Sequence, residues 1–178
     1  MKLLLHFLAA LGLSLAVAPL LAAPAAGQQI YFDASEGGWV DKKANLVWGI
    51  DPVLIAGQNG VWDLNLQPSN YAGAAAIAAN YPAFCASWGW ADYSIVAANW
   101  ESQGLAWRLP TLKEAQDALS KGLFGKTAWV YPGDRWTSTS GNGKNKNSKW
   151  VTTATYGYGY PVDPNAYLAW PLVVRPYR

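Results

Sequence analysis

Histidine, cysteine and charged side chains are scarce in this 178-residue chain. It has one histidine, His6, and one cysteine, Cys85, and only 13% of its residues are charged. Because His6 lies in an apolar N-terminal run, a chain that loses this run keeps no histidine. Such a chain cannot form a Ser-His-Asp triad, a Cys-His pair or a histidine-ligated zinc site. A single cysteine also excludes an internal disulfide and an iron–sulfur cluster.

The N-terminal 25 residues have the pattern of a secretory signal peptide. Lys2 gives a positive start, residues 3–21 are an apolar run, and the small residues Ala23 and Ala25 fit a cleavage site. An uncleaved membrane anchor is the alternative. We expect a cleaved signal peptide over residues 1–25 and one exported domain, periplasmic or at the cell surface, over residues 26–178.

Overall charge points to no particular partner. The chain has 13 basic and 11 acidic residues, a net charge of +2. Loss of Lys2 with the leader lowers the net charge to about +1, which predicts neither nucleic-acid binding nor membrane binding. Cys85 is expected to be a small buried hydrophobe, with an intermolecular disulfide as the alternative.

The hydrophobic pattern predicts an α+β domain, because strands come first, then helices, then strands again. Its strands are short and antiparallel, with two or three helices. The expected strands cover 29–33, 39–40, 45–50, 135–139, 149–153 and 167–174. The expected helices cover 71–80 and a stretch that begins at 112, whereas 84–103 is expected to be a loop with a helix near 91–101.

The clearest local pattern is a helix start. Thr111 is followed three residues later by Glu114, the spacing of a capping box in which each side chain accepts the other residue's backbone N–H. Leu112, Ala115 and Leu119 then recur on one helical face.

Four segments together resemble one known family. They are Asn45-Leu46-Val47-Trp48, Trp107-Arg108-Leu109-Pro110-Thr111 with Glu114, Trp136-Thr137-Ser138-Thr139, and Trp170-Pro171-Leu172-Val173-Val174-Arg175. In this order and spacing they resemble the bacterial Lcl C-terminal domain family over residues 31–175. The resemblance implies a C-type-lectin-like fold, an extracellular location, and binding or adhesion. In collagen-like adhesins this domain trimerises and is associated with sulfated glycosaminoglycans.

Two features depart from the family pattern. Ala115 stands where a leucine usually follows the glutamate, and no collagen repeat precedes the domain in this sequence. Trimerisation therefore does not carry over, and a homo-oligomer stays open. The RLPT block also resembles formylglycine-generating enzymes, which need cysteine chemistry in their C-terminal part, but no cysteine follows Cys85. We expect no enzyme; a glycosidase acting through two carboxylates is a remaining alternative.

The family-like residues are expected to hold the fold rather than to touch a ligand. We expect each arginine among them to pair with a carboxylate such as Asp33, Asp41 or Asp117. The set comprises Trp48, Trp107, Arg108, Thr111, Glu114, Trp136, Trp170 and Arg175, with the four tryptophans assigned to the core.

Two neighbouring segments are candidate ligand-binding surfaces. Lys144, Lys146 and Lys149 lie in an asparagine-rich loop without acids, which suits the anionic groups of an acidic polysaccharide. The alternative is a solvated hairpin tip. Tyr156, Tyr158 and Tyr160 recur at period two, so an extended chain projects all three rings to one side, where they can stack on a sugar or bind a protein.

Calcium binding is suggested weakly by two groups of oxygen ligands. The segment 163–165, Asp-Pro-Asn, is similar to the calcium and sugar motif of animal C-type lectins, although a Pro-Asn turn also explains it. Asp51, Asn59 and Asp63 fit no known calcium loop. We therefore expect no cofactor, with calcium as the alternative.

These features support two hypotheses of different classes. The first is an exported, non-enzymatic binding or adhesion module that recognises a glycan, such as an acidic polysaccharide, at the bacterial surface. The second is a structural subunit of an envelope or surface assembly whose aromatic surface is a protein interface. The expected partner is accordingly a glycan or a surface protein.

Overall fold

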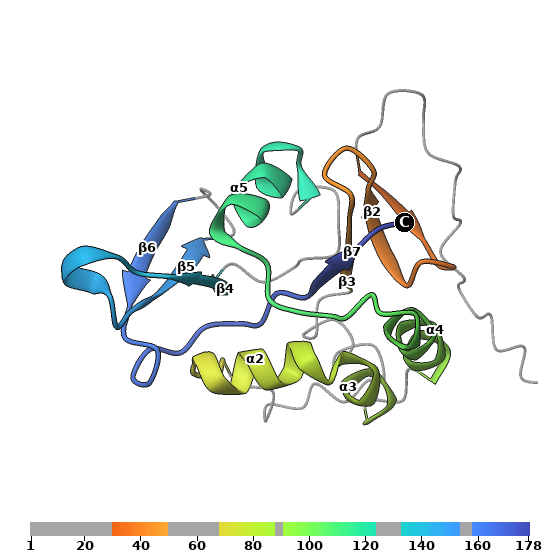
Figure 1. Ribbon diagram of the computed structural model, residues 1–178, viewed down its shortest axis with the longest axis horizontal. Helices are drawn as coiled ribbons and strands as arrows, with labels where there is room; N and C mark the ends of the chain where they lie inside the picture. The colour runs from red at the N-terminus through yellow and green to blue at the C-terminus, as the bar shows by residue number, and fades with distance from the viewer. Residues whose placement is uncertain (1–29, 50–67, 88–90, 124–132, 154–157) are drawn as a thin grey trace, which may run out of the picture.

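A computed structural model describes residues 30–49, 68–87, 91–123, 133–153 and 158–178 of the protein (Figure 1). The predicted signal peptide, Tyr156, and the candidate calcium ligands Asp51, Asn59 and Asp63 lie outside these residues.

The first sheet contains four short strands in the order β1-β2-β3-β7, with every neighbouring pair antiparallel. The strands are β1 (Tyr31–Asp33), β2 (Gly38–Asp41), β3 (Leu46–Gly49) and β7 (Val174–Pro176). β2 and β3 approach closely, since a Cβ atom at Gly38 would lie 2.1 Å from the backbone oxygen of Trp48. β7, the last strand of the chain, pairs with β3 and so completes the sheet that begins with β1.

The second sheet contains three antiparallel strands in the order β4-β5-β6. They are β4 (Asp134–Ser140), β5 (Lys149–Thr153) and β6 (Gly159–Val162). The pairing of β4 with β5 shifts register between Trp136 and Ser140, where β4 leads into the hairpin loop.

Helices cover the two sheets from opposite sides: α2, α3 and α4 lie below them and α5 lies above them in Figure 1. Asn70 caps α2 by accepting a hydrogen bond of 3.0 Å from the Gly73 amide. No described helix has the length and hydrophobicity needed to cross a membrane. The helices are α2 (Tyr71–Ala79), α3 (Tyr81–Ser87), α4 (Ala91–Ser102) and α5 (Leu112–Ser120).

The C-terminal segment connects the two sheets. Trp170 donates to the carbonyl of Asp134 and accepts from the amide of Trp136, each at 2.9 Å, so it lies beside β4. Val174, the first residue of β7, exchanges two hydrogen bonds of 2.9 Å with Arg108. One extended segment thus holds both sheets in place relative to each other.

Aromatic side chains fill much of the core. Trp48 and Trp136 are completely buried, Trp107 is buried, and Trp170 is only half-buried. Cys85 is also completely buried, and its burial raises the pKa of the thiol to about 11. The expected burial of Cys85 is therefore confirmed, and the position does not suit an intermolecular disulfide.

The predicted α+β class with short antiparallel strands is confirmed, but three details differ. The described residues form four α-helices rather than two or three, because residues 84–87 belong to α3 instead of a loop. The last strand is β7 rather than 167–174, since Pro171 has no N–H with which to continue a ladder. β6 was not expected.

Candidate ligand-binding groove

The predicted capping box of α5 is confirmed, and it supports an ion pair. Thr111 Oγ1 accepts from the Glu114 amide at 3.2 Å, and the Thr111 amide donates to Glu114 Oε2 at 2.7 Å. Arg108 donates to both Glu114 carboxylate oxygens, at 2.9 and 2.7 Å. Arg108 thus pairs with Glu114 instead of an aspartate. Burial works against the charged carboxyl, but the hydrogen bonds from Arg108 and Thr111 outweigh it and lower the pKa of Glu114.

This helix start is joined to the second sheet. Ser138 donates its amide proton to the Pro110 carbonyl at 2.7 Å, and Thr139 Oγ1 accepts from the Leu112 amide at 2.8 Å. β4 therefore satisfies a backbone donor in the first turn of α5. Gly159 of β6 lies so close that a Cβ atom there would be 2.5 Å from Leu112 Cδ1. The β4–β5 hairpin consequently extends from a fixed base.

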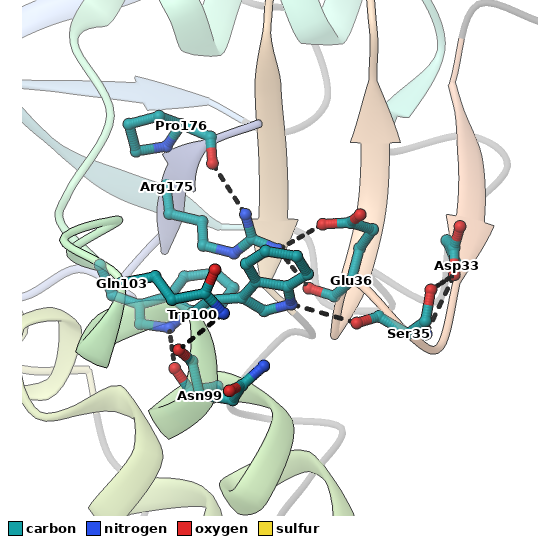
Figure 2. Close-up of polar contacts among 10 residues, drawn as sticks. Asp33, Ser35, Glu36, Asn99, Trp100, Gln103, Arg175 and Pro176 are labelled. Atoms are coloured by element: carbon teal, nitrogen blue, oxygen red, sulfur yellow. Dashed lines mark hydrogen bonds and ion pairs between the residues drawn. The ribbon is translucent and has the colours of Figure 1, made fainter. Parts of the chain in front are cut away.

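Arg175 has a comparable structural environment in the first sheet. It is completely buried and donates to Glu36 Oε2 and the Glu36 carbonyl at 2.7 Å and to the Pro176 carbonyl at 2.8 Å (Figure 2). Its guanidinium carbon lies 4.6 Å from the ring centroid of Trp100 and 5.3 Å from that of Trp107. Burial lowers the pKa of Arg175, and Glu36 opposes this shift. The expected carboxylate partner is thus Glu36 rather than an aspartate.

The loop between β4 and β5 is stabilised by its own backbone. Gly141 donates to the Ser148 carbonyl and Ser148 donates to the Asn145 carbonyl, each at 2.8 Å, around the 3₁₀ turn η1 (Gly143–Asn145). A Cβ atom at Gly141 would lie 1.9 Å from the Asn145 oxygen, so a larger residue would displace the turn. The backbone therefore sets the positions of the loop side chains.

A groove of about 480 Å³ lies between this loop and the chain that follows β6. Both segments lie at the left end of the molecule in Figure 1. The volume is in the range of small-ligand sites. The groove is lined by Lys144, Asn145, Asn147, Ser148, Pro161, Val162, Asp163 and Asn165.

Most polar side chains in the groove are uncommitted. Within the part of the chain that the structure describes, the side chains of Lys144, Asn145, Asn147 and Asn165 make no hydrogen bond or ion pair. By contrast, the Ser148 hydroxyl donates to the Asn145 carbonyl at 2.6 Å. The side-chain amides of three asparagines and the ammonium group of Lys144 are therefore available to a ligand.

The three candidate lysines occupy different environments. Lys144 lines the groove, whereas Lys146 is exposed outside its lining. Lys149 is half-buried, donates to Ser140 Oγ at 2.8 Å and lies 4.6 Å from the ring centroid of Tyr71. The structure thus places one lysine, rather than three, at the groove.

The candidate tyrosines do not form one exposed strip. Tyr158 is 71% exposed, but Tyr160 is half-buried and its hydroxyl donates to the Asp134 carboxylate. Tyr167 donates to the same carboxylate oxygen, and the two hydroxyls lie 2.8 Å apart. Burial, together with the hydrogen bond to Asp134, raises the pKa of Tyr160. Tyr160 therefore ties β6 to β4.

The described residues contain no group of three or more His, Cys, Asp or Glu side chains that could hold a metal ion. Asp163 Oδ1 accepts from the Asn165 amide at 2.8 Å, which is the hydrogen bond of an Asx turn. The turn interpretation of the segment 163–165 thus agrees with its hydrogen bonding.

Sequence reasoning missed half of the groove because it missed β6. The register of β5 with β6 sets Lys149 opposite Val162, which brings Pro161 and the following turn alongside the hairpin loop. The alternating Tyr and Gly residues before Val162 were the available hint, because period two is typical of a strand. The asparagines of the loop were visible in the sequence, but their common orientation was not.

Neither the known protein-family models nor the curated proteins include a match to this chain. The resemblance to the Lcl C-terminal domain family therefore stays a prediction, and the groove is the basis on which function is inferred.

Proposed function

We propose that this protein is an exported, non-enzymatic binding or adhesion module that recognises a glycan at the bacterial surface. The groove is the observation that supports this proposal. Each asparagine amide both donates and accepts hydrogen bonds, so it suits neighbouring sugar hydroxyls. Pro161 and Val162 add apolar surface for the C–H face of a sugar ring.

A second feature favours a binding role. The groove is built on a loop whose backbone hydrogen bonds are internal, from Gly141 to Ser148. A site that is already formed loses less conformational entropy when a ligand binds. The proposed location, periplasmic or at the cell surface, is based on the signal-peptide pattern of residues 1–25.

A glycan array with the purified protein tests this function. We expect binding to at least one glycan class, and we expect the double variant Asn147→Ala/Asn165→Ala to weaken it by about tenfold or more, because each lost hydrogen bond costs about 1 kcal/mol. Asn99→Ala is the matched control, since Asn99 is an exposed asparagine on α4, away from the groove. Binding that the double variant leaves intact would contradict the proposal.

The alternative, a subunit of a surface assembly, is favoured by a different observation. Tyr158, Leu168 and Ile95 are large apolar side chains that are 71%, 58% and 68% exposed. Light scattering after size-exclusion chromatography separates the two functions. An oligomer that binds no glycan would favour the assembly, and a monomer that binds a glycan would favour the module.

A further inference from the structure

The charge of the groove is low and balanced. Among the lining residues that the structure describes, Lys144 is the one cation and Asp163 the one acid. The Lys144 ammonium has no partner in the described part of the chain. One carboxylate oxygen of Asp163 already accepts a hydrogen bond from the backbone N–H of Asn165, which leaves the side-chain amide of Asn165 available. A ligand thus meets one available positive charge, with a negative charge elsewhere on the lining.

The other two lysines do not add to that positive charge equally. The Lys149 ammonium donates a hydrogen bond to the Ser140 hydroxyl and lies over the Tyr71 ring, so it already has partners within the protein. Lys146 is exposed but does not line the groove. Lys146 lies between the lining residues Asn145 and Asn147 in sequence, but its own side chain does not line the groove, so its ammonium acts on a ligand only as a longer-range charge that dissolved salt screens.

From this arrangement we infer that the groove selects a glycan segment with one carboxylate among neutral hydroxyls, that is, a single uronic acid unit between neutral sugars. The inference rests on the proposed glycan-binding function. Lys144 pairs with the carboxylate, and the amides of Asn145, Asn147 and Asn165 bind the hydroxyls. A densely sulfated chain is disfavoured, because Asp163 repels additional anionic groups.

A calorimetric titration of the full-length protein with three sets of tetrasaccharides tests the inference. The first set carries one uronic acid in different stereochemical forms, the second consists of the methyl esters of the same compounds, and the third carries sulfate on every sugar. We expect a member of the first set to bind about tenfold more tightly than its own methyl ester. We also expect it to bind more tightly than any sulfated compound.

Three lysine variants localise the effect. Lys144→Gln is expected to reduce affinity for the uronic acid compound by about tenfold and to leave affinity for its methyl ester unchanged. Lys146→Gln is the matched control, since it removes an equally exposed charge outside the groove, and we expect a change of less than twofold. Lys149→Gln tests the separate environment of Lys149, and its thermal unfolding shows whether the hairpin is preserved.

The outcomes separate this inference from the proposed function. The inference would be overturned, and the proposed function kept, if the protein binds the uronic acid compound and its ester equally well. The same conclusion would follow if it binds the sulfated set more tightly. Equal losses of affinity from Lys144→Gln and Lys146→Gln would also overturn the inference, because the selectivity would then come from the overall charge of the loop and not from one lysine in the groove. If the protein binds neither these compounds nor any glycan on the array, both proposals fail.

Discussion

Two charged side chains of this protein, one in the first sheet and one beside the second, are used in opposite ways. In the first sheet, Arg175 is completely buried, pairs with Glu36 and lies over Trp100. Beside the second sheet, Lys144 is exposed and lines a groove without a partner in the described residues. A buried charge must be paired, because losing water without compensation costs several kcal/mol. An exposed charge has no such need and stays available to a ligand.

The difference indicates a division of roles between buried, paired charges and exposed, unpaired ones. Charges of the first kind hold the fold, and the Arg108–Glu114 pair is intermediate, since 41% of the Arg108 side chain is exposed. Charges of the second kind can change without affecting the fold. The effect of a charged side chain on stability thus depends on its burial. The three predictions below run from the most buried charge to the most exposed.

The largest effect is expected where the Arg175 pair is broken. Glu36→Gln leaves the guanidinium buried without a counter-charge, so the free energy of unfolding should fall by about 3 kcal/mol. Asp33→Asn is the control, because Asp33 lies at the end of β1 but binds only the Ser35 amide and hydroxyl among described contacts. Urea denaturation measures both variants. Equal losses for the two would remove the distinction between buried and exposed charges.

A smaller, pH-dependent effect is expected for Glu114. Its pKa in the folded protein is lowered, so the stability that its charge contributes is fully present above the unfolded pKa of about 4.3 and is lost as pH falls through the folded pKa. Glu114→Gln keeps an acceptor for the capping box but removes the ion pair. Because Arg108 is partly exposed, we expect a loss of about 1 kcal/mol at pH 7.

The pH dependence distinguishes this ion pair from a purely structural change. The stabilities of wild type and Glu114→Gln should converge in denaturation experiments at decreasing pH. Lys113→Gln breaks an exposed pair with Asp117, where 82% of the Lys113 side chain is exposed, and should cost less than about 0.5 kcal/mol. A constant difference between wild type and Glu114→Gln at all pH values would argue against the proposed linkage.

The smallest effect on stability is expected at the groove. Lys144→Gln should change the free energy of unfolding by less than about 0.5 kcal/mol, because the side chain is exposed and unpaired among the described residues. Thermal unfolding measures this directly. A loss comparable to that of Glu36→Gln would mean that Lys144 has a structural role and would weaken the contrast between Arg175 and Lys144.

Local patterns explain why part of the fold could be predicted. Thr111 and Glu114 act within one helical turn, so their spacing alone specified the start of α5. Asn70 begins α2 in a similarly local way, because its side chain accepts from the backbone amide of Gly73, three residues later. β3 is a short run of mostly apolar residues that are all buried, and such a run likewise needs no distant partner to be recognised. Each of these features depends on residues that are neighbours in the sequence.

Long-range pairing explains what could not be predicted. Arg175 and Glu36 are 139 positions apart, and no local pattern distinguishes Glu36 from the aspartates that were expected as partners. The commitment of Lys149 to Tyr71 and Ser140 depends on how α2 lies against the hairpin. The groove was missed for the same reason, because half of its lining comes from β6 and the turn after it.

The amino-acid sequence was enough to predict the α+β class, the capping box of α5 and the burial of Cys85, and it shows the scarcity of histidine and cysteine. These properties follow from composition and from contacts within a few residues. Which charges are paired and which stay available could be seen in the three-dimensional structure alone. Pairing and burial depend on distant segments meeting in space, and that meeting separates Lys144 in the groove from Lys149 in the hairpin.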